Sequence, residues 1–299
     1  MRCLLWLAML ASSAHAAGAQ DLVPGAYTPA PVGFNVFTAT AVFNTGDLSF
    51  DATLPIEDGH STIGWSSFSF ARTLSIGGRY ANIGVGVPFV RGRVSGRVRG
   101  QFEEATRTGL GDLAARIAIN LYGAPALTAK EFAAYRARTI VGLSLVLIAP
   151  TGEYDNSQIV NIGTNRWAFK PEVGLSRRRG RWTFEGDFGA TFFTDNTDYF
   201  NGGVREQSPI ASFQGHLIYT MRPGLWVAGD GNFWNGGRIT ANGAPNIVDQ
   251  ENSRIGLTVA VPVNAHQFRI SYSLGAYTTI GGDYQSVGVS YSRAWAGRP

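Results

Sequence analysis

The sequence predicts an all-β protein: a transmembrane antiparallel β-barrel of about twelve strands, with a short periplasmic helix near residues 124–136. Three observations support this fold class. Apolar and polar residues alternate with a period of two in one segment after another, the connections between segments are alternately long and short, and the chain begins with an export signal.

Residues 1–16 have the features of a secretory signal peptide. Arg2 precedes an apolar run over residues 3–11, and small residues follow at Ala14 and Ala16. We expect cleavage after residue 16, or as far along as residue 20. The apolar run is too short to cross a bilayer as a helix. Cys3 is the only cysteine and lies in the signal, so the mature chain forms no internal disulfide.

The composition suits a barrel better than a helical membrane protein. No run of 18 or more apolar residues follows the signal, whereas 38 glycines, 36 aromatic residues and only 15% charged residues fit strands that alternate lipid-facing and lumen-facing positions. The net charge of +4 is small and spread along the chain, so nucleic-acid binding has no support.

The stretch "GLGDLAARIAINLYG", residues 109–123, invites interpretation as a phosphate-binding loop that opens a helix. A helix would place Arg116 and Asn120 on the face that must enter a core. A strand instead puts Leu113, Ile117 and other apolar residues on one face and these two polar residues on the other. The third glycine of the dinucleotide pattern is also missing, so we expect a membrane strand.

The same test along the chain predicts twelve strands. They cover residues 34–43, 65–74, 78–98, 110–122, 138–149, 166–177, 181–193, 209–221, 224–234, 253–263, 266–277 and 284–295.

The connections predict the orientation of the barrel. Polar stretches at 44–64, 99–109, 150–165, 194–208, 235–252 and 278–283 occupy every other junction, and short turns at 75–77, 178–180, 222–223 and 264–265 lie between them. Long extracellular loops and short periplasmic turns are typical of outer-membrane barrels. We therefore expect a periplasmic N-terminal segment at 17–33, the barrel at 34–295 and a tail at 296–299.

One junction on the short-turn side is long and favours a helix. In "GAPALTAKEFAAYR", residues 123–136, Thr128 is a suitable N-cap and Glu131 stands three residues later, as in a capping box. We expect a short periplasmic helix that acts as a lid or foot at the barrel end; docking of a partner is the alternative.

A few strand residues go against the pattern. Pro171 removes a ladder donor and predicts a bulge. Arg72 and Arg293 share the apolar parity, but both lie near periplasmic ends, where a lipid-facing cation costs about 0–1 kcal/mol. Aromatic residues near strand ends are expected to form the membrane girdle: Trp65, Trp167, Trp182, Phe192 and Trp295.

Five blocks carry a resemblance to a known family: "GLGDLAARIAINLYGAPALTAKEF", "TIVGLSLVLIAPTGEYD", "VNIGTNRWAFKPEVGLS", "WTFEGDFGATFFTDN" and "REQSPIASFQGHLIY". From about residue 72 to 295, the chain closely resembles the outer-membrane transporter family labelled for a MetA pathway of phenol degradation. The resemblance implies relation to the fatty-acid and toluene outer-membrane channels, and uptake of small hydrophobic or aromatic compounds. One departure is that "AGRP" follows Trp295, where the family pattern has the terminal aromatic close to the end.

The parity of the strands also predicts which side chains line the lumen. They carry both signs of charge: Arg116, Asn120, Arg166, Lys170, Glu172, Glu185, Asp187, Gln214, His216, Trp226, Asp230, Asn232, Arg254 and Arg269. Trp226 and Trp234 would suit an aromatic ring, or they pack against loops. The set describes either a pore that passes or binds a solute, or a salt-bridged plug that closes the barrel.

Enzymatic and metal-dependent functions have little support. His60, His216 and His266 form no metal-type pair, although His60–Ser61 loosely resembles the His/Ser pair of the outer-membrane phospholipase barrel. "TDNTD" at 194–198 could offer oxygen ligands to calcium, but a solvated loop tip is the simpler interpretation. We expect no enzyme activity, cofactor or metal. The expected partners are outer-membrane lipid, lipopolysaccharide, the barrel-assembly machinery and a small hydrophobic or aromatic solute. A closed structural or adhesion barrel and an outer-membrane hydrolase stay as alternatives.

Overall fold

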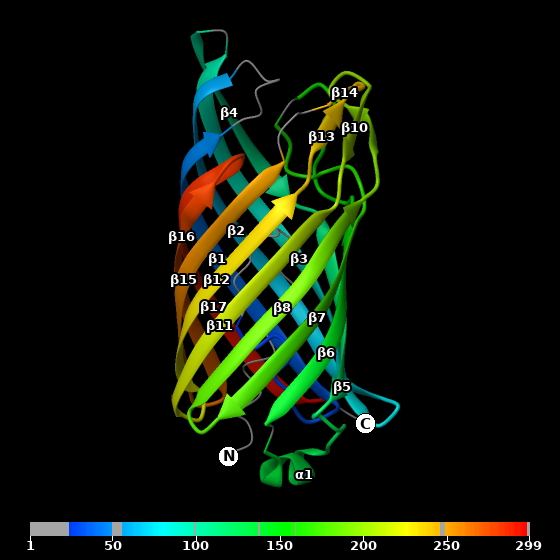
Figure 1. Cartoon of the computed structure of the whole chain (residues 1–299), viewed down its shortest axis with the longest axis vertical. Coiled ribbons are helices and arrows are strands. Elements are labelled where there is room, and N and C mark those ends of the chain that lie inside the picture. Colours follow the sequence, from blue (N-terminus) through cyan, green and yellow to red (C-terminus); the bar gives the residue numbers. More distant parts are fainter. Residues whose placement is uncertain are drawn as a thin grey trace.

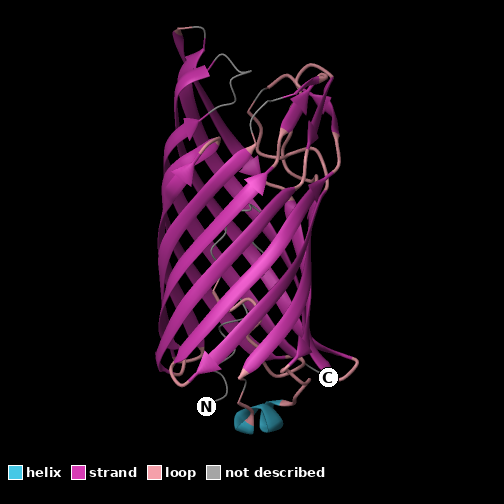
Figure 2. Ribbon diagram, in the orientation of Figure 1, coloured by secondary structure: helices cyan, strands magenta, loops and turns pink. Residues whose placement is uncertain are grey.

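The computed structural model describes residues 24–49, 56–98, 100–136, 138–158, 160–245 and 249–297. The expected signal peptide lies outside the described residues. Within them, twelve strands form one closed barrel, with a helix at its lower end and a small sheet at its upper end (Figure 1, Figure 2). The barrel strands are β1 (Phe34–Ser49), β2 (Ile56–Ile76), β3 (Arg79–Val98), β5 (Leu113–Tyr122), β6 (Thr139–Ala149), β7 (Ala168–Arg179), β8 (Trp182–Phe193), β11 (Ile210–Arg222), β12 (Leu225–Gly236), β15 (Gln250–Val263), β16 (His266–Thr278) and β17 (Gly281–Ala296).

Neighbouring barrel strands are antiparallel, and the wall closes on itself. β1 pairs with both β2 and β17, and β3 pairs with both β2 and β5. The register partner of Phe34 at the start of β1 is Ala296 at the end of β17. Because the barrel is closed, the backbone N–H and C=O groups of every strand can pair with a neighbouring strand. Lipid offers no hydrogen-bond partners for groups left unpaired. The predicted fold class is confirmed.

The period-two pattern decides which side chains face outward. In β5, Ile117 is 43% exposed, whereas the adjacent Arg116 is 5% exposed. Large apolar side chains on the other strands are exposed in the same way, among them Phe68, Val85, Leu143, Val173, Phe188, Leu217, Leu257, Ile270 and Val289. An outward apolar belt of this kind is what the hydrocarbon core of a bilayer requires.

The long connections contain more regular structure than we expected. Residues 99–109 were expected to be a polar loop, but β4 (Gln101–Leu110) is a strand that pairs with the upper part of β3. The connections expected at 194–208 and 235–252 contain β9 (Asn196–Tyr199), β10 (Gly203–Gln207), β13 (Ile239–Ala241) and β14 (Ala244–Pro245), which form a four-stranded sheet above one side of the barrel (Figure 1). Strands above the membrane need no lipid-facing apolar side, so the alternation that identifies barrel strands is weak in them.

The predicted periplasmic helix is present as α1 (Ala129–Ala134), below the barrel in Figure 1. Its capping box is complete: the Thr128 backbone N–H donates to Glu131 Oε2 at 2.9 Å, and the Glu131 backbone N–H donates to Thr128 Oγ1 at 3.4 Å. The Thr128 backbone N–H and hydroxyl both donate to the Glu131 carboxylate, and these two hydrogen bonds hold the pKa of Glu131 below its usual value.

Pro171 stays within β7 without a bulge. β7 keeps one register with β8 on both sides of it, Phe169 pairing with Phe192 and Glu172 with Gly189, while the ladder is interrupted between these pairs. The missing N–H of Pro171 therefore removes a ladder contact and leaves the register unchanged.

The expected girdle is partly wrong. Trp167, Trp182, Phe192 and Trp295 are exposed on the outer face. Trp65 instead has the inward parity of β2, and its register partners Val42 and Val90 have the inward parity of β1 and β3. The reason is that β2 is longer than expected and its outward residues are the even-numbered ones, such as Phe68 and Phe70.

Candidate functional site

The interior of the barrel collects the polar residues of the wall. Every residue of the predicted lumen set is buried or half-buried, while large apolar side chains next to many of them in the chain, such as Ile117, Phe188 and Leu217, are exposed. Twelve of them come from seven strands and one loop of the described part: Arg116 and Asn120 from β5, Arg166 from the loop before β7, Lys170 and Glu172 from β7, Glu185 and Asp187 from β8, His216 from β11, Trp226 and Asp230 from β12, Arg254 from β15 and Arg269 from β16. Only Arg166 lies outside a strand, because β7 begins at Ala168.

A first charged group lies on β5, β6 and β7. The Glu172 carboxylate is 2.9 Å from Lys170 Nζ and 3.9 Å from Arg116 Nε. The Ser144 hydroxyl donates to Glu172 Oε2 at 2.8 Å. The side chains of Arg116, Lys170 and Glu172 are all about a tenth exposed or less. The structure therefore brings three predicted residues together as a paired buried cluster.

A second group lies across β8, β11, β12 and β15. His216 Nδ1 and Asp230 Oδ1 are 2.8 Å apart, and the Thr258 hydroxyl donates to Asp230 Oδ2 at 2.7 Å. The Asp230 carboxylate can only accept, so the hydrogen on His216 lies at Nδ1. Glu185 is on the neighbouring strand in register with His216. The His216 and Asp230 side chains are both buried.

Each of the four predicted lumen arginines lies over an aromatic ring. Arg116 is 5.3 Å from the Tyr27 ring centroid, Arg166 4.4 Å from Phe193, Arg254 4.2 Å from Tyr284 and Arg269 5.5 Å from Trp226. Burial, with the nearby Arg205 cation, lowers the pKa of the Arg166 guanidinium in its extracellular loop to about 9. A guanidinium stacked on a ring is stabilised without a carboxylate partner, so the interior presents aromatic faces beside hydrogen-bond donors.

The opposite wall of the barrel is rich in hydroxyl groups. Thr38 and Ser292 hydroxyls are 3.2 Å apart, and those of Thr40 and Ser290 are 3.0 Å apart. Further hydroxyls of the same inward parity on β2 and β16 are Ser67, Ser69, Ser271 and Ser273. The lumen thus has one charged side and one neutral polar side.

Residues 24–33, directly before β1, lie inside the barrel. We expected residues 17–33 to be a periplasmic segment, but its described part, residues 24–33, contacts the inner wall. Asn120 Nδ2 donates to the Tyr27 carbonyl at 3.0 Å, and the Gly25 N–H donates to Glu185 Oε2 at 2.6 Å. We refer to residues 24–33 as the plug segment. It satisfies polar groups of the wall that would otherwise be buried unpaired.

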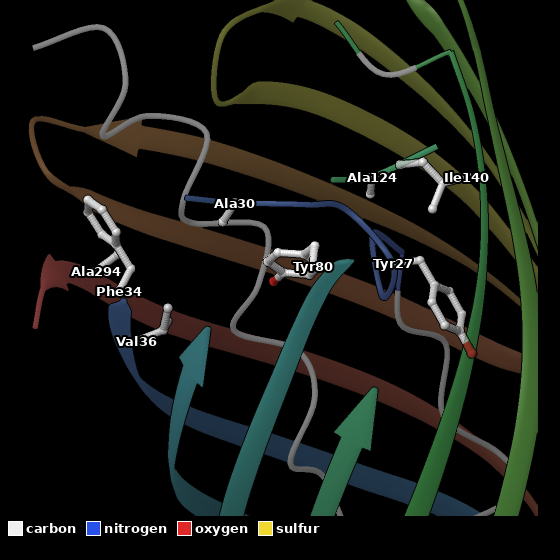
Figure 3. Packing of buried hydrophobic residues seen from close by; sticks show 8 residues of the cluster. All are labelled: Tyr27, Ala30, Phe34, Val36, Tyr80, Ala124, Ile140 and Ala294. Carbon is white, nitrogen blue, oxygen red and sulfur yellow. The ribbon is translucent and has the colours of Figure 1, made fainter. Parts of the chain in front are cut away.

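Apolar packing holds the plug segment at the lower end of the barrel. Tyr27 and Ala30 belong to a buried cluster with Phe34, Val36, Tyr80, Ala124, Ile140 and Ala294 (Figure 3). Backbone hydrogen bonds join Val32 N–H to the Leu127 carbonyl at 2.9 Å and Gly33 N–H to the Thr73 carbonyl at 3.0 Å. These residues lie at the end of the barrel that carries the short turns, so the plug segment narrows the periplasmic end of the lumen.

Some buried polar atoms of the interior have no protein partner in the described part of the chain. They include Arg116 Nη1 and Nη2, Asp187 Oδ1 and His216 Nε2. A cavity of about 10 Å³ lies next to Asp187, between Lys170, Glu172, Ser212 and Gln214. Buried polar atoms without partners are costly, about 1–3 kcal/mol each, so the interior suits water or a polar group of a solute.

Sequence reasoning missed three contributors to this interior: Tyr27, Ser144 and Trp65. Tyr27 precedes the first strand and has no periodic pattern around it. Ser144 has the inward parity of β6 but carries no charge, and Trp65 was assigned to the wrong face. A usable signal was present in Gly142 and Gly174, since glycine at an inward strand position marks a close approach of another chain segment.

The residues considered for catalysis and metal binding do not come together. His60 lies in β2, not in a loop, and its ring contacts Thr45 at 3.3 Å and Asp47 at 3.1 Å. Ser61 is buried on the other side of the same strand, because successive strand residues point to opposite faces. Asp198 of "TDNTD" accepts a hydrogen bond from Asn156 at 2.8 Å. Among the described residues, no group of three or more His, Cys, Asp or Glu side chains could hold a metal ion.

Comparison with known proteins identifies the family. The family described as "Putative MetA-pathway of phenol degradation" matches residues 24–291. The chain belongs to this family. A comparison with curated proteins gave no match. In the described part of the chain, no helix has the length and apolar character to span a membrane.

Solved structures agree on the fold of this family member. It is similar to an outer membrane channel from Pseudomonas putida F1, with a TM-score of 0.76 and 20% identity over 92% of this chain and 100% of that one. It is also similar to the β domain of the Bordetella autotransporter BrkA, with a TM-score of 0.52 and 11% identity over 87% of this chain and 99% of that one. With its closed wall and apolar belt, the protein is an outer-membrane β-barrel.

Proposed function

We propose that this protein is a passive outer-membrane channel for small hydrophobic or aromatic compounds, and that it is not an enzyme. The family description names phenol degradation, and the channel from Pseudomonas putida F1 has the same fold. The family description supports an aromatic compound as the solute, the similar structure supports a channel, and the interior supplies the chemical argument.

The observation that carries the proposal is the pairing of interior arginines with aromatic rings. Arg254 over Tyr284 and Arg166 over Phe193 belong to the extracellular half, and Arg269 over Trp226 belongs to the periplasmic half. A small aromatic solute can stack on such rings and guanidinium groups along the way. Hydroxyls of the opposite wall, such as Thr40 and Ser290, can bind its polar substituent. We propose the predicted lumen set as the lining of this path.

The test is the electrical behaviour of the purified protein in planar bilayers. We expect ion current through single barrels, and brief interruptions whose frequency rises with added phenol. Bilayers without protein are the control. Absence of both current and solute-dependent swelling of proteoliposomes would refute the channel and favour the alternative of a closed structural barrel. Lipid hydrolysis by the protein that Ser61→Ala abolishes would favour the hydrolase instead.

We also propose a contact with phosphorylated glycolipid of the outer leaflet, meaning lipopolysaccharide. The outward parity of β3 is apolar at Val85, Val87 and Phe89 and changes to Arg91 and Arg93 directly above. A membrane strand needs about 9–11 residues to cross the hydrocarbon, so these arginines lie at headgroup height. Their outward register neighbours carry hydroxyls: Thr62 on β2 and Thr106 and Thr108 on β4. We call these five residues the basic platform.

Assembly is proposed to follow the usual route for barrels. β17 closes the wall against β1, and Trp295 near its end lies on the outer face with its ring 6.2 Å from that of Phe70. We propose β17 as the segment that the barrel-assembly machinery receives.

A further inference from the structure

The side chain of Tyr27 occupies a socket in the barrel wall. Gly142 of β6 and Gly174 of β7 are register partners, and a Cβ on either glycine would overlap the Tyr27 ring. The ring therefore lies directly against the backbone of the two strands. Any residue other than glycine at these two positions would prevent such a close approach. Arg116 covers the ring with its guanidinium 5.3 Å from the centroid. Tyr27 is 3% exposed.

The hydroxyl of Tyr27 has a defined role in the socket. Tyr27 Oη lies 3.2 Å from Ser144 Oγ, and Ser144 Oγ donates to Glu172 Oε2 at 2.8 Å. Serine has one hydroxyl hydrogen, and the carboxylate of Glu172, paired with Lys170, can only accept. Ser144 is therefore an acceptor toward Tyr27, and the Tyr27 hydroxyl is the donor.

The socket thus recognises each part of a phenol group. The paired glycines and Arg116 hold an aromatic ring, and Ser144 accepts a hydrogen bond from its hydroxyl. In Figure 3 the Tyr27 ring points toward the green strands and away from Ala30 and Phe34. Tyr27 shares the buried cluster with Ala30, while the backbone hydrogen bonds of Val32 and Gly33 anchor the segment independently of the socket.

We propose that this socket, formed by Arg116, Gly142, Ser144 and Gly174, is a binding site for a free monocyclic phenol, and that Tyr27 is its built-in occupant. A phenol that enters from the lumen competes with Tyr27 and releases the first residues of the plug segment. The anchors at Val32 and Gly33 keep the remainder in place. This inference rests on the proposed function, and it names the substrate class and the step that widens the periplasmic end.

Tethering explains why Tyr27 holds the socket when no solute is present. A tethered ligand competes at an effective concentration in the millimolar range, so a free phenol has to reach a similar concentration. Removal of the Tyr27 side chain should then raise the apparent affinity for phenol by about tenfold or more. A ring without a donor hydroxyl leaves Ser144 Oγ with its bond to Glu172 but with no donor to accept from, and such a site discriminates strongly against that ring.

The experiment measures phenol binding to the detergent-solubilised full-length protein by calorimetry. We expect Tyr27→Ala to bind phenol at least about tenfold more tightly than the wild type, and to bind anisole, which has no donor hydroxyl, at least about tenfold more weakly than phenol. Gly142→Ala added to Tyr27→Ala should abolish binding, because its methyl group occupies the place of the Tyr27 ring. Gly229→Ala, whose added Cβ meets nothing within 4 Å, is the matched control and should leave binding unchanged.

Equal phenol affinity in the wild type and Tyr27→Ala, or binding that survives Gly142→Ala, would overturn the proposal. If Tyr27→Ala does not fold, as judged by migration on unheated gels, Tyr27→Phe keeps the ring and removes only the hydroxyl. It should still bind phenol more tightly than the wild type, and unchanged affinity there also refutes the site. Calorimetry measures binding independently of flux, so the two proposals can fail separately. If affinity depends on the socket but the protein conducts no current, the channel is refuted and the binding site stands. If the protein conducts current but affinity does not depend on the socket, the binding site is refuted and the channel stands.

Discussion

The Asp112 carboxylate binds Thr164 twice, accepting from its backbone N–H at 2.9 Å and from its hydroxyl at 2.7 Å. The same carboxylate accepts from the Gly152 N–H at 2.9 Å. Asp112 stands directly before β5, whereas Gly152 and Thr164 lie at the two ends of the connection between β6 and β7. One buried side chain thus ties an extracellular loop to the rim of the barrel.

Asp112→Asn should loosen this loop and leave the barrel intact. The amide keeps one acceptor oxygen and turns an NH₂ group toward N–H donors, so at least one buried hydrogen bond is lost. We expect a loss of about 1–3 kcal/mol and faster proteolysis within residues 150–165, measured on refolded protein. Asp155→Asn is the control, since the Asp155 carboxylate accepts from the backbone N–H and hydroxyl of Ser157, two residues further along the same loop. Equal proteolysis of the two variants would contradict the role of Asp112.

The Lys170–Glu172 pair should be energetically coupled. Removing one partner leaves a buried ion without its counter-ion, so we expect Glu172→Gln and Lys170→Gln each to cost about 1.5–3 kcal/mol. The double variant should cost clearly less than the sum, because no uncompensated charge remains between these two positions. Urea unfolding in lipid vesicles provides the measurement. Strict additivity would mean that water in the lumen screens the pair.

The sequence was sufficient to predict the strands of the barrel wall, because the alternation of apolar and polar residues that marks them is a local pattern. Arg116 and Asn120 differ in parity from Ile117 and Leu121, and the bilayer makes that parity a strong constraint, since a charge that faces lipid at midplane costs about 2–4 kcal/mol. A local pattern also predicted the helix N-cap at Thr128, because its capping-box partner Glu131 is only three residues away in the sequence.

The plug segment could not be predicted in this way. Tyr27 and Ser144 are 117 positions apart, and their contact depends on two glycines in different strands. No periodic pattern records such a contact. Trp65 shows a related limit: the start of β2 was expected at residue 65, but the strand begins at Ile56, above the membrane, where polar residues on both faces hide the alternation.

An arginine on the outward face should measure the depth of each position in the membrane. Leu145 in β6 and Val263 at the end of β15 are 42% and 47% exposed. Leu145→Arg places a cation near the midplane and should cost about 2–4 kcal/mol, whereas Val263→Arg lies near the periplasmic interface and should cost about 0–1 kcal/mol. Unfolding in vesicles gives both values. Similar costs at the two positions would contradict the assigned apolar belt.

The basic platform should bind phosphorylated glycolipid. Arg91→Glu combined with Arg93→Glu reverses two exposed cations at headgroup height, while Phe89 and Leu110 below them stay in place to contact acyl chains. We expect the amount of lipopolysaccharide that copurifies with the protein to fall several-fold. In the wild type, lipid A with both phosphates should raise the unfolding temperature more than its dephosphorylated form, because charge-assisted hydrogen bonds to phosphate are lost in the latter.

A charge-matched control separates this binding from the effect of net charge. Arg177 and Arg179 lie on the outer face of β7 at its opposite, periplasmic end. Changing both to Glu alters the net charge by the same amount, yet lipopolysaccharide occupies only the outer leaflet, so copurification should stay at the wild-type level. An equal loss in both double variants would show that general electrostatics, not the platform formed by Arg91 and Arg93, retains the lipid.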